Sequence, residues 1–327
     1  MMVEPELVER FRGDLAPLWP FVGEEGARLG LAVSGGGDSL ALLLLAHALL
    51  PGRIEAATVD HALRRESAEE AAMVAAVCER LGVPHAVLRV EVAKGNLQDR
   101  ARFARYYALG RWCDERDLKG LATAHQLDDQ AETFVMRLNR GSGVAGLAAI
   151  RALGMVPGAG VRLVRPLLGW RRAELANLVR TSQLVPVHDP SNENPSFDRV
   201  RIRQALASAD WLDPVGIARS AQLLAQADLA IEWMIDREYA ECVSIGEGEA
   251  TYHALRTGLG GPLIHAGVIQ SIYRGFGSSI GRSDAAAMVH DLSQGRKTNV
   301  AGLQATPRDV DGERIWAFTP EQSRSTS

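Results

Sequence analysis

Short apolar runs alternate with longer amphipathic stretches over the first half of the chain. Four of these runs have the length of buried strands: residues 29–33, 54–59, 85–90 and 120–123. Between the second and third runs, residues 66–81 carry carboxylates at the start and an arginine near the end, as helix termini prefer. A fifth run at 161–164 precedes a helical pattern at 171–182. Repeated strand–helix units predict the α/β fold class, with a Rossmann-like parallel sheet and helices on both faces.

The pattern changes near residue 210. Residues 198–209 predict a short helix with a basic face, and residues 215–239 and 261–273 then show long helical patterns without further strand–helix alternation. The length of 327 residues is also about twice that of a typical domain. We therefore predict an α/β domain at residues 1–210 and a smaller, mainly helical domain at residues 211–327.

Composition and charge exclude several classes of protein. The longest apolar stretch, residues 40–50, is too short to cross a bilayer, which needs about 20 residues. The first twelve residues carry three glutamates where a secretory signal needs basic residues, so we expect a cytoplasmic protein without membrane contact. Cys78, Cys113 and Cys242 are too far apart for a disulfide framework or a cysteine-rich metal site. The net charge of −4 excludes a uniformly basic nucleic-acid binder but permits a local basic patch.

A glycine-rich loop follows the first predicted strand, in the sequence Ser34-Gly35-Gly36-Gly37-Asp38-Ser39. Consecutive glycines let several backbone N–H groups point into one concavity, and the helix expected from about Leu40 adds its positive end, which suits a phosphate or pyrophosphate. A carboxylate in such a loop repels phosphate unless a cation intervenes, so Asp38 points to Mg²⁺. The alternative is a plain glycine-rich turn with Asp38 as the helix N-cap.

Two carboxylates lie together in the helical pattern of residues 128–140. Ala131, Phe134 and Leu138 belong to an apolar stripe, whereas Asp129 and Glu132 share roughly the opposite side. Paired carboxylates at the ligand edge of a sheet can hold a metal, bind an ammonium group or accept a proton. Acidic residues in a first turn also occur simply to complement the helix dipole, and this alternative stays open.

Polar residues at the ends of two predicted strands add candidates for nucleotide contact. Val59, Asp60 and His61 end or follow the second strand, and Ala124 and His125 follow the fourth. Open α/β sheets bind ligands at the carboxyl ends of their strands, so nucleotide contact is expected there. A solvated polar turn is the alternative.

Arginines gather in two parts of the chain. Their planar guanidinium groups bind phosphates in a bidentate manner, although most such runs are solvated helix faces. The first group is Arg100, Arg102, Arg105 and Arg111; the second is Arg162, Arg165, Arg171, Arg172, Arg199, Arg201 and Arg203.

The glycine-rich hexapeptide resembles the PP-loop, Ser-Gly-Gly-x-Asp-Ser, of the N-type ATP pyrophosphatases, which cleave ATP between its α and β phosphates. Further blocks, in the right order over about residues 29–205, are similar to those of the tRNA(Ile)-lysidine synthetases. They are Val59-Asp60-His61-Ala62-Leu63-Arg64, Ala101-Arg102-Phe103-Ala104-Arg105-Tyr106, Ala122-Thr123-Ala124-His125, Asp128-Asp129-Gln130-Ala131-Glu132-Thr133, Arg140-Gly141-Ser142-Gly143, Arg165-Pro166-Leu167-Leu168 and Asp189-Pro190-Ser191-Asn192.

This resemblance implies a two-step reaction. ATP adenylates the wobble cytidine of the isoleucine tRNA with a CAU anticodon and releases pyrophosphate; free L-lysine then displaces AMP to form lysidine. It makes Asp38, Asp129 and Glu132 catalytic, with Asp38 also holding Mg²⁺. The nucleotide contacts would be Ser34, Gly35, Gly36, Gly37, Asp38, Ser39, Val59, Asp60, His61, Ala124 and His125, and the tRNA contacts Arg102, Arg105, Arg201 and Arg203. By the same analogy residues 1–210 are the PP-loop catalytic domain, residues 211–327 recognise tRNA, and a homodimer is one assembly to test.

The sequence departs from the family pattern at two positions. Val200 stands where asparagine is usual, and Gln126 stands where a second histidine is common. One alternative function is that of a PP-loop tRNA-modifying enzyme of the 2-thiocytidine type, which would be expected to need paired cysteines that this chain lacks. The other is a non-enzymatic adenine-nucleotide-binding module, which would not need Asp129 and Glu132.

Overall fold

The chain consists of two units, each with its own hydrophobic core. The computed structural model describes residues 3–60, 66–90, 97–187, 194, 196–254 and 261–321. It divides into Met1–Ala225 and Gln226–Ser327. We predicted a boundary at residue 210, whereas the division falls after Ala225, within the residues of helix α9 (Pro214–Cys242).

The described part of the first unit contains a six-stranded sheet in the order β3-β2-β1-β4-β6-β5. Neighbouring strands are parallel except β5, which runs antiparallel to β6. The structure thus confirms the α/β class and the five predicted strands. The strands are β1 (Leu29–Ala32), β2 (Ile54–Asp60), β3 (His85–Arg89), β4 (Leu121–Ala122), β5 (Leu153–Met155) and β6 (Arg162–Val164).

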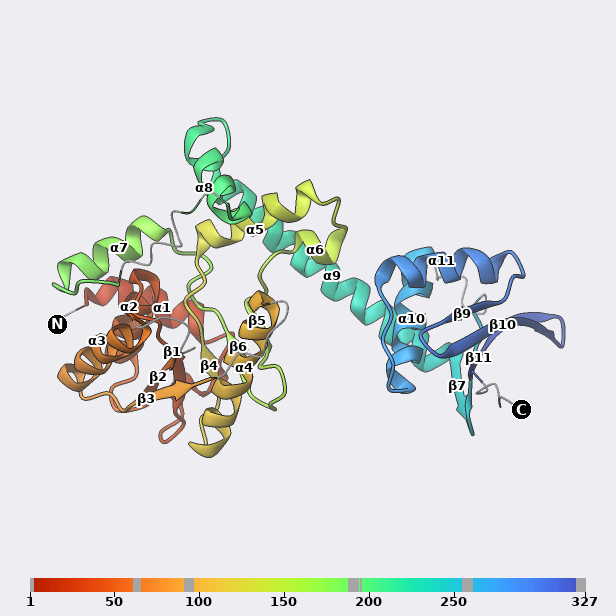
Figure 1. The fold of residues 1–327 in the computed structure, drawn as a ribbon, viewed down its shortest axis with the longest axis horizontal. Coiled ribbons are helices and arrows are strands. Elements are labelled where there is room, and N and C mark those ends of the chain that lie inside the picture. Colours follow the sequence, from red (N-terminus) through yellow and green to blue (C-terminus); the bar gives the residue numbers. More distant parts are fainter. Residues whose placement is uncertain are drawn as a thin grey trace. The chain divides into compact units, whose positions relative to one another are not determined.

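Helices cover both faces of this sheet, which explains why its central strands are apolar on both sides. One core contains the sheet residues Leu29 and Leu31 together with α1, α2, α3 and α7, and a second core on the other face contains α4 (Figure 1). The helices are α1 (Pro5–Leu15), α2 (Gly37–Leu49), α3 (Glu66–Leu81), α4 (Leu97–Glu115), α5 (Leu127–Asn139), α6 (Val144–Leu147), α7 (Arg172–Thr181) and α8 (Asp198–Ser208), with a 3₁₀ turn at Pro20–Gly23.

The start of α2 differs from the prediction. The helix begins at Gly37 rather than near Leu40, because residues 40–46 are all buried and this packing outweighs the low helix propensity of glycine. Each fully buried leucine in this run contributes about 1.5–3 kcal/mol to that packing. The last three residues of the glycine-rich loop therefore form the first turn of the helix.

The second unit combines helices with an antiparallel sheet. The helices α10 (Pro262–Gly275) and α11 (Arg282–Ser293) fit the expected helical texture. The structure adds a sheet, absent from the prediction, whose order within the described residues is β7-β8-β11-β10-β9. Its strands are β7 (Val243–Gly246), β8 (Glu249–Tyr252), β9 (Thr298–Val300), β10 (Leu303–Val310) and β11 (Glu313–Pro320).

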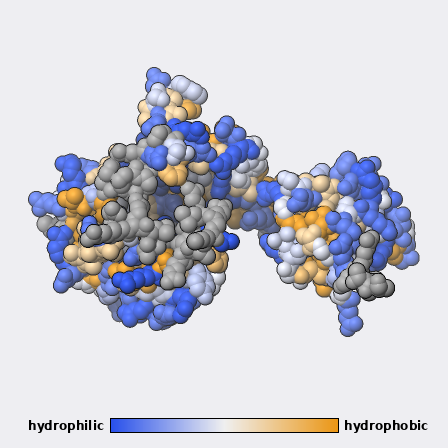
Figure 2. Space-filling model, in the orientation of Figure 1, coloured by the Kyte–Doolittle hydropathy of each residue, from blue (hydrophilic) through white to orange (hydrophobic). Residues whose placement is uncertain are grey.

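In the described part of the chain, no helix is long and apolar enough to cross a bilayer. Hydrophilic residues predominate on the visible face of each unit, with smaller hydrophobic groups among them (Figure 2). Such scattered hydrophobic residues are normal for a globular protein.

Candidate active site

The glycine-rich loop and the acidic helix meet where the strand order of the sheet reverses. From β1 the chain moves to β2 and β3 on one side, and then crosses to β4 on the other side of β1. The glycine-rich loop follows β1, and α5 follows β4. The carboxyl ends of two strands at such a switch point form the crevice in which open α/β sheets bind ligands.

The backbone of the loop requires glycine at its first turn. Gly35 has a φ of +89°, and a Cβ atom there would lie 3.0 Å from Val187 Cγ2 and 3.1 Å from Met73 Cε. Ser39 Oγ donates a hydrogen bond to Gly36 O at 2.9 Å and accepts one from Ser34 N at 3.2 Å. These bonds fix the loop around the first turn of α2, whose backbone N–H groups favour an anion.

Asp38 does not cap α2. Gly36 is the N-cap residue, so the alternative interpretation of Asp38 as a helix cap is wrong. Burial and the nearby charge of Asp129 raise the pKa of Asp38 to about 6, although Arg172 acts in the opposite direction. A carboxyl that is costly to ionise beside a second carboxylate favours a cation as its partner.

Asp129 both stabilises the start of its helix and acts as a carboxylate of the site, the two interpretations that the sequence left open. It occupies the third position of α5, and its Oδ2 atom accepts a hydrogen bond from the N-cap residue, Gln126 N, at 3.1 Å. Its other oxygen, Oδ1, lies 3.3 Å from Arg172 Nη2 and 3.2 Å from Arg199 Nη2. Burial raises the pKa of Asp129, while the charge of Arg199 lowers it in part. Asp129 therefore caps the helix and faces the site with different oxygens.

Glu132 is the centre of an arginine cluster. Only 1% of its surface is exposed, yet three arginines of the described chain hydrogen-bond to its carboxylate. The donor–acceptor distances are 3.0 Å for Arg172 Nη2, 2.8 Å for Arg199 Nε and 2.8 Å for Arg203 Nε. Burial raises its pKa, but the Arg203 hydrogen bond and the other arginines outweigh this and lower the pKa below 4.5. Glu132 therefore stays ionised at neutral pH.

Helix α8 supplies two of these arginines from one face. It packs beside α5 (Figure 1), and residues four apart, Arg199 and Arg203, reach the Glu132 carboxylate together. Arg201 is exposed and pairs instead with Asp198 on its own helix. The two arginines that we predicted to act together on tRNA thus have different surroundings. The site residues that we did not single out, Arg172 and Arg199, carried only the signal of belonging to the second arginine group.

The predicted nucleotide contacts at the other strand ends occupy the same edge of the sheet. Asp60 is buried at the end of β2, and its Oδ1 atom accepts a hydrogen bond from Ser67 Oγ at 2.6 Å. Val59 precedes it in β2 and is half-buried, as Ala124 is after β4. His61 lies outside the described residues.

His125 follows Ala124 and is held in its neutral form. Its Nδ1 atom lies 3.1 Å from Thr123 Oγ1. Burial and several arginine charges, from Arg165, Arg199, Arg102 and Arg105, lower the pKa of His125 to about 3. Neutral imidazole beside a positive group is a hydrogen-bonding partner rather than a competing cation.

Arg102 and Arg105 lie on α4, and Arg102 is exposed and lies 5.2 Å from the Tyr106 ring centroid. The charges of Arg102 and Arg105 lower the pKa of His125, after burial, Arg165 and Arg199.

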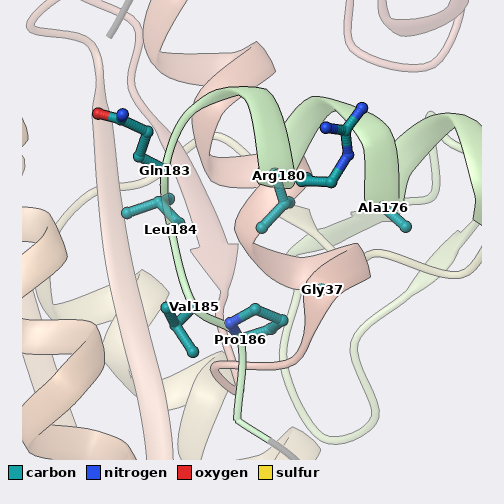
Figure 3. A pocket seen from close by; sticks show the side chains of 8 residues that line it. Gly37, Ala176, Arg180, Gln183, Leu184, Val185 and Pro186 are labelled. Carbon is teal, nitrogen blue, oxygen red and sulfur yellow. The ribbon is translucent and has the colours of Figure 1, made fainter.

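A hollow of about 430 Å³ flanks the loop on another side (Figure 3). Gly37 of α2 lies across it from the end of α7, and its apolar lining includes Leu184, Val185 and Pro186. Its lining includes Arg180 but none of the site carboxylates. We therefore regard it as a side wall of the loop rather than as the reaction centre.

The donors present fit a metal that is shared with a ligand. No cluster of three or more histidine, cysteine, aspartate or glutamate side chains within the described ranges is arranged to hold a metal ion by itself. Mg²⁺, however, is usually bound by one or two carboxylates together with substrate phosphates and water. Asp38, inside an anion-binding loop, is suited to such a shared site.

The fold and the loop define a PP-loop, ATP-using enzyme, and a family model described as a PP-loop domain matches residues 9–209. A tRNA(Ile)-lysidine synthase of Novosphingobium aromaticivorans is 53% identical over 241 residues, which cover 73% of this chain and 72% of that protein. A second, from Zymomonas mobilis, is 41% identical over 296 residues, covering 89% of this chain and 88% of that protein. The chain belongs to the tRNA(Ile)-lysidine synthase family.

Among solved structures, a U34-tRNA thiolase from Methanococcus maripaludis has the same fold. It superimposes with a TM-score of 0.56 at 19% identity, over 69% of this chain and 78% of that one. At this identity the likeness concerns the fold alone.

Proposed function

We propose that this enzyme joins free L-lysine to the wobble cytidine of isoleucine tRNA with a CAU anticodon, through an adenylated cytidine. The observation that carries the proposal is that Asp38, in the loop after β1, comes within electrostatic reach of Asp129 on α5, after β4. Asp38 thereby lies in the glycine-rich loop, while Asp129 and Glu132 both contact Arg172. A phosphate-releasing step and an amine-transfer step both need such groups.

In the first step, the base carbonyl oxygen of cytidine attacks the α-phosphorus of ATP, and the bond to the β-phosphate oxygen breaks. The loop of residues 34–39 binds the leaving pyrophosphate, because the N–H groups and the positive dipole end at the start of α2 favour an anion there. Asp38 would hold Mg²⁺ together with the phosphates, and the ion would neutralise charge on the leaving group. We assign the nucleoside contacts to Asp60, Ala124 and His125, which lie at or just after the carboxyl ends of β2 and β4.

In the second step, the lysine Nζ attacks the activated carbon of the base, and the carbon–oxygen bond to AMP breaks. The amine must be neutral when it attacks and must lose a proton afterwards. Asp129 is the better acceptor, since burial raises its pKa, whereas Glu132 remains ionised among its arginines. We therefore assign proton acceptance to Asp129 and positioning of the arginines to Glu132.

Arginines on two helices are proposed to hold the tRNA. Arg201 is exposed on α8, and Arg102 and Arg105 lie on α4 near the site edge. Local clusters of this kind bind phosphates although the whole chain has a net charge of −4. We assign recognition of the tRNA body to the second unit, as the family analogy predicts.

The experiment that tests this assignment separates the two steps. Asp129→Asn should still release pyrophosphate from ATP with CAU-anticodon isoleucine tRNA, but should transfer lysine at least about 100-fold more slowly, the usual contribution of a general base. Adenylated tRNA should accumulate and be detected by mass spectrometry of the digested RNA. Unchanged lysine transfer would contradict the role of Asp129, and pyrophosphate release without any tRNA dependence would contradict the substrate.

A further inference from the structure

An exposed aromatic pair lies on α4, outside the carboxylate and arginine cluster. Phe103 is 59% exposed and Tyr107 is 47% exposed. Their rings are stacked, with centroids 6.2 Å apart and planes inclined by 16°. Burial of aromatic rings is favourable, and these two rings are not buried in the core. An exposed aromatic patch of this kind marks an interaction site.

The same helix face carries arginines at both ends of the pair. Residues 100, 103, 107 and 111 follow helical spacing, so Arg100 and Arg111 bracket Phe103 and Tyr107 along one stripe. Both arginines are exposed. A stripe of this composition combines positive charge with flat π-faces, the two features that single-stranded nucleic acid needs for binding.

The stripe begins toward the carboxyl edge of the sheet, and the turn after β5 lies beside its second ring. Helix α4 follows β3, so its first turns lie toward the carboxyl edge of the sheet, where the active-site loops gather. Behind the second ring, a Cβ atom at Gly158 would lie 3.2 Å from Tyr107 Cδ2, which places the turn after β5 against that ring. A ring held in place loses little conformational entropy when a base stacks on it.

We propose that Phe103 and Tyr107 form a stacking platform for unpaired nucleotides of the tRNA anticodon loop, with Arg100 and Arg111 contacting the flanking phosphates. This inference rests on the proposed tRNA substrate. A base that enters the active site must leave its stack, and its unstacked neighbours then need an apolar surface. A second copy of the chain fits the stripe less well, because a symmetric contact would bring its arginines against one another.

The test compares the wild type with the double variant Phe103→Ala/Tyr107→Ala in binding to full-length isoleucine tRNA, measured by fluorescence anisotropy over a range of salt. We expect the variant to bind about 5- to 100-fold more weakly, with an unchanged slope of log Kd against log salt, since stacking does not release counterions. The single variant Phe103→Tyr should bind the tRNA as tightly as the wild type does, because it keeps the π-face. Arg100→Ala, in contrast, should lower the salt slope by about one.

A duplex RNA of equal charge without unpaired bases is the matched control, and the alanine variant should bind it as the wild type does. Equal tRNA affinity of variant and wild type, or an equal loss for the duplex, would overturn the platform. A changed sedimentation coefficient with unchanged tRNA affinity would instead identify a self-association surface. Lysidine formation by the wild type is measured in parallel. If the wild type forms lysidine while the alanine variant binds tRNA normally, the platform fails and the proposed function stands. If the wild type neither binds nor modifies the tRNA, both fail.

Discussion

Replacing Glu132 by glutamine should destabilise the first unit strongly. The Glu132 side chain is 2% exposed, and the three arginines around it are 33% (Arg172), 40% (Arg199) and 34% (Arg203) exposed. Removing one partner of a buried ionic cluster costs about 3–5 kcal/mol. Because these arginines can rehydrate in part, we expect the lower end, about 3 kcal/mol, or a Tm lowered by roughly 6–12 °C for a unit of this size.

The pH dependence of this effect follows from the pKa of Glu132. Burial raises that pKa, but the Arg203 hydrogen bond and the charges of Arg172 and Arg199 lower it below the ordinary 4.5. A carboxyl with a lowered pKa in the folded state stabilises the protein above pH 4.5, and this stabilisation is lost as the pH falls through the folded-state value. The Tm difference between wild type and Glu132→Gln should therefore be full at pH 7 and should shrink below pH 4.5.

Glu115→Gln is the matched control. Glu115 pairs with Arg111 at 2.9 Å, but both side chains are more than 60% exposed. Exposed pairs contribute about 0–1 kcal/mol, so the control should shift the Tm only slightly. Thermal unfolding followed by circular dichroism measures both variants. A Glu132→Gln variant that is no less stable than Glu115→Gln at pH 7 would refute the interpretation of the cluster.

Four further substitutions test other parts of the site. Asp38→Ala should abolish pyrophosphate release while the Tm stays within a few degrees, and undiminished release would remove the argument for a metal at Asp38. Gly35→Ala should cost about 1–3 kcal/mol, because φ is +89° and Val187 and Met73 lie close, whereas Gly37→Ala, with open space around its Cβ position, should be tolerated in thermal unfolding. Arg201→Ala should weaken tRNA binding and lower its salt slope by about one, and an unchanged slope would return Arg201 to an ordinary solvated position.

The five parallel strands of the first unit could be predicted because each is a short apolar run, whereas the short antiparallel strand β5 (Leu153–Met155) was missed. The beginning of α2 could not be predicted, since glycine at positions 36 and 37 weakens any local helix signal and only the buried run after Leu40 fixes the helix. The sheet of the second unit was missed for a similar reason. In its strand β10 the alternation of buried and less buried positions stops at Pro307, and the exposed Arg308 and Asp309 follow. The available signal was the turn Asp311-Gly312, in which both residues have positive φ, as hairpin turns favour.

The acidic pair of α5 could be predicted from spacing, but its partners could not. Glu132 meets Arg199 and Arg203, which lie 67 and 71 residues further along the chain. Such contacts depend on how α8 packs on α5, which no local pattern records. The i,i+4 spacing of the two arginines indicates only that they share a helix face.

The most direct test of the central claim is incorporation of labelled L-lysine into CAU-anticodon isoleucine tRNA, with ATP present or withheld, followed by nucleoside analysis. We predict ATP-dependent labelling of the wobble cytidine and its loss in Asp38→Ala. Pyrophosphate release without lysine incorporation would keep the ATP-using enzyme and contradict the substrate. Neither product, with a control enzyme active on the same tRNA, would contradict the account and favour a nucleotide-binding module.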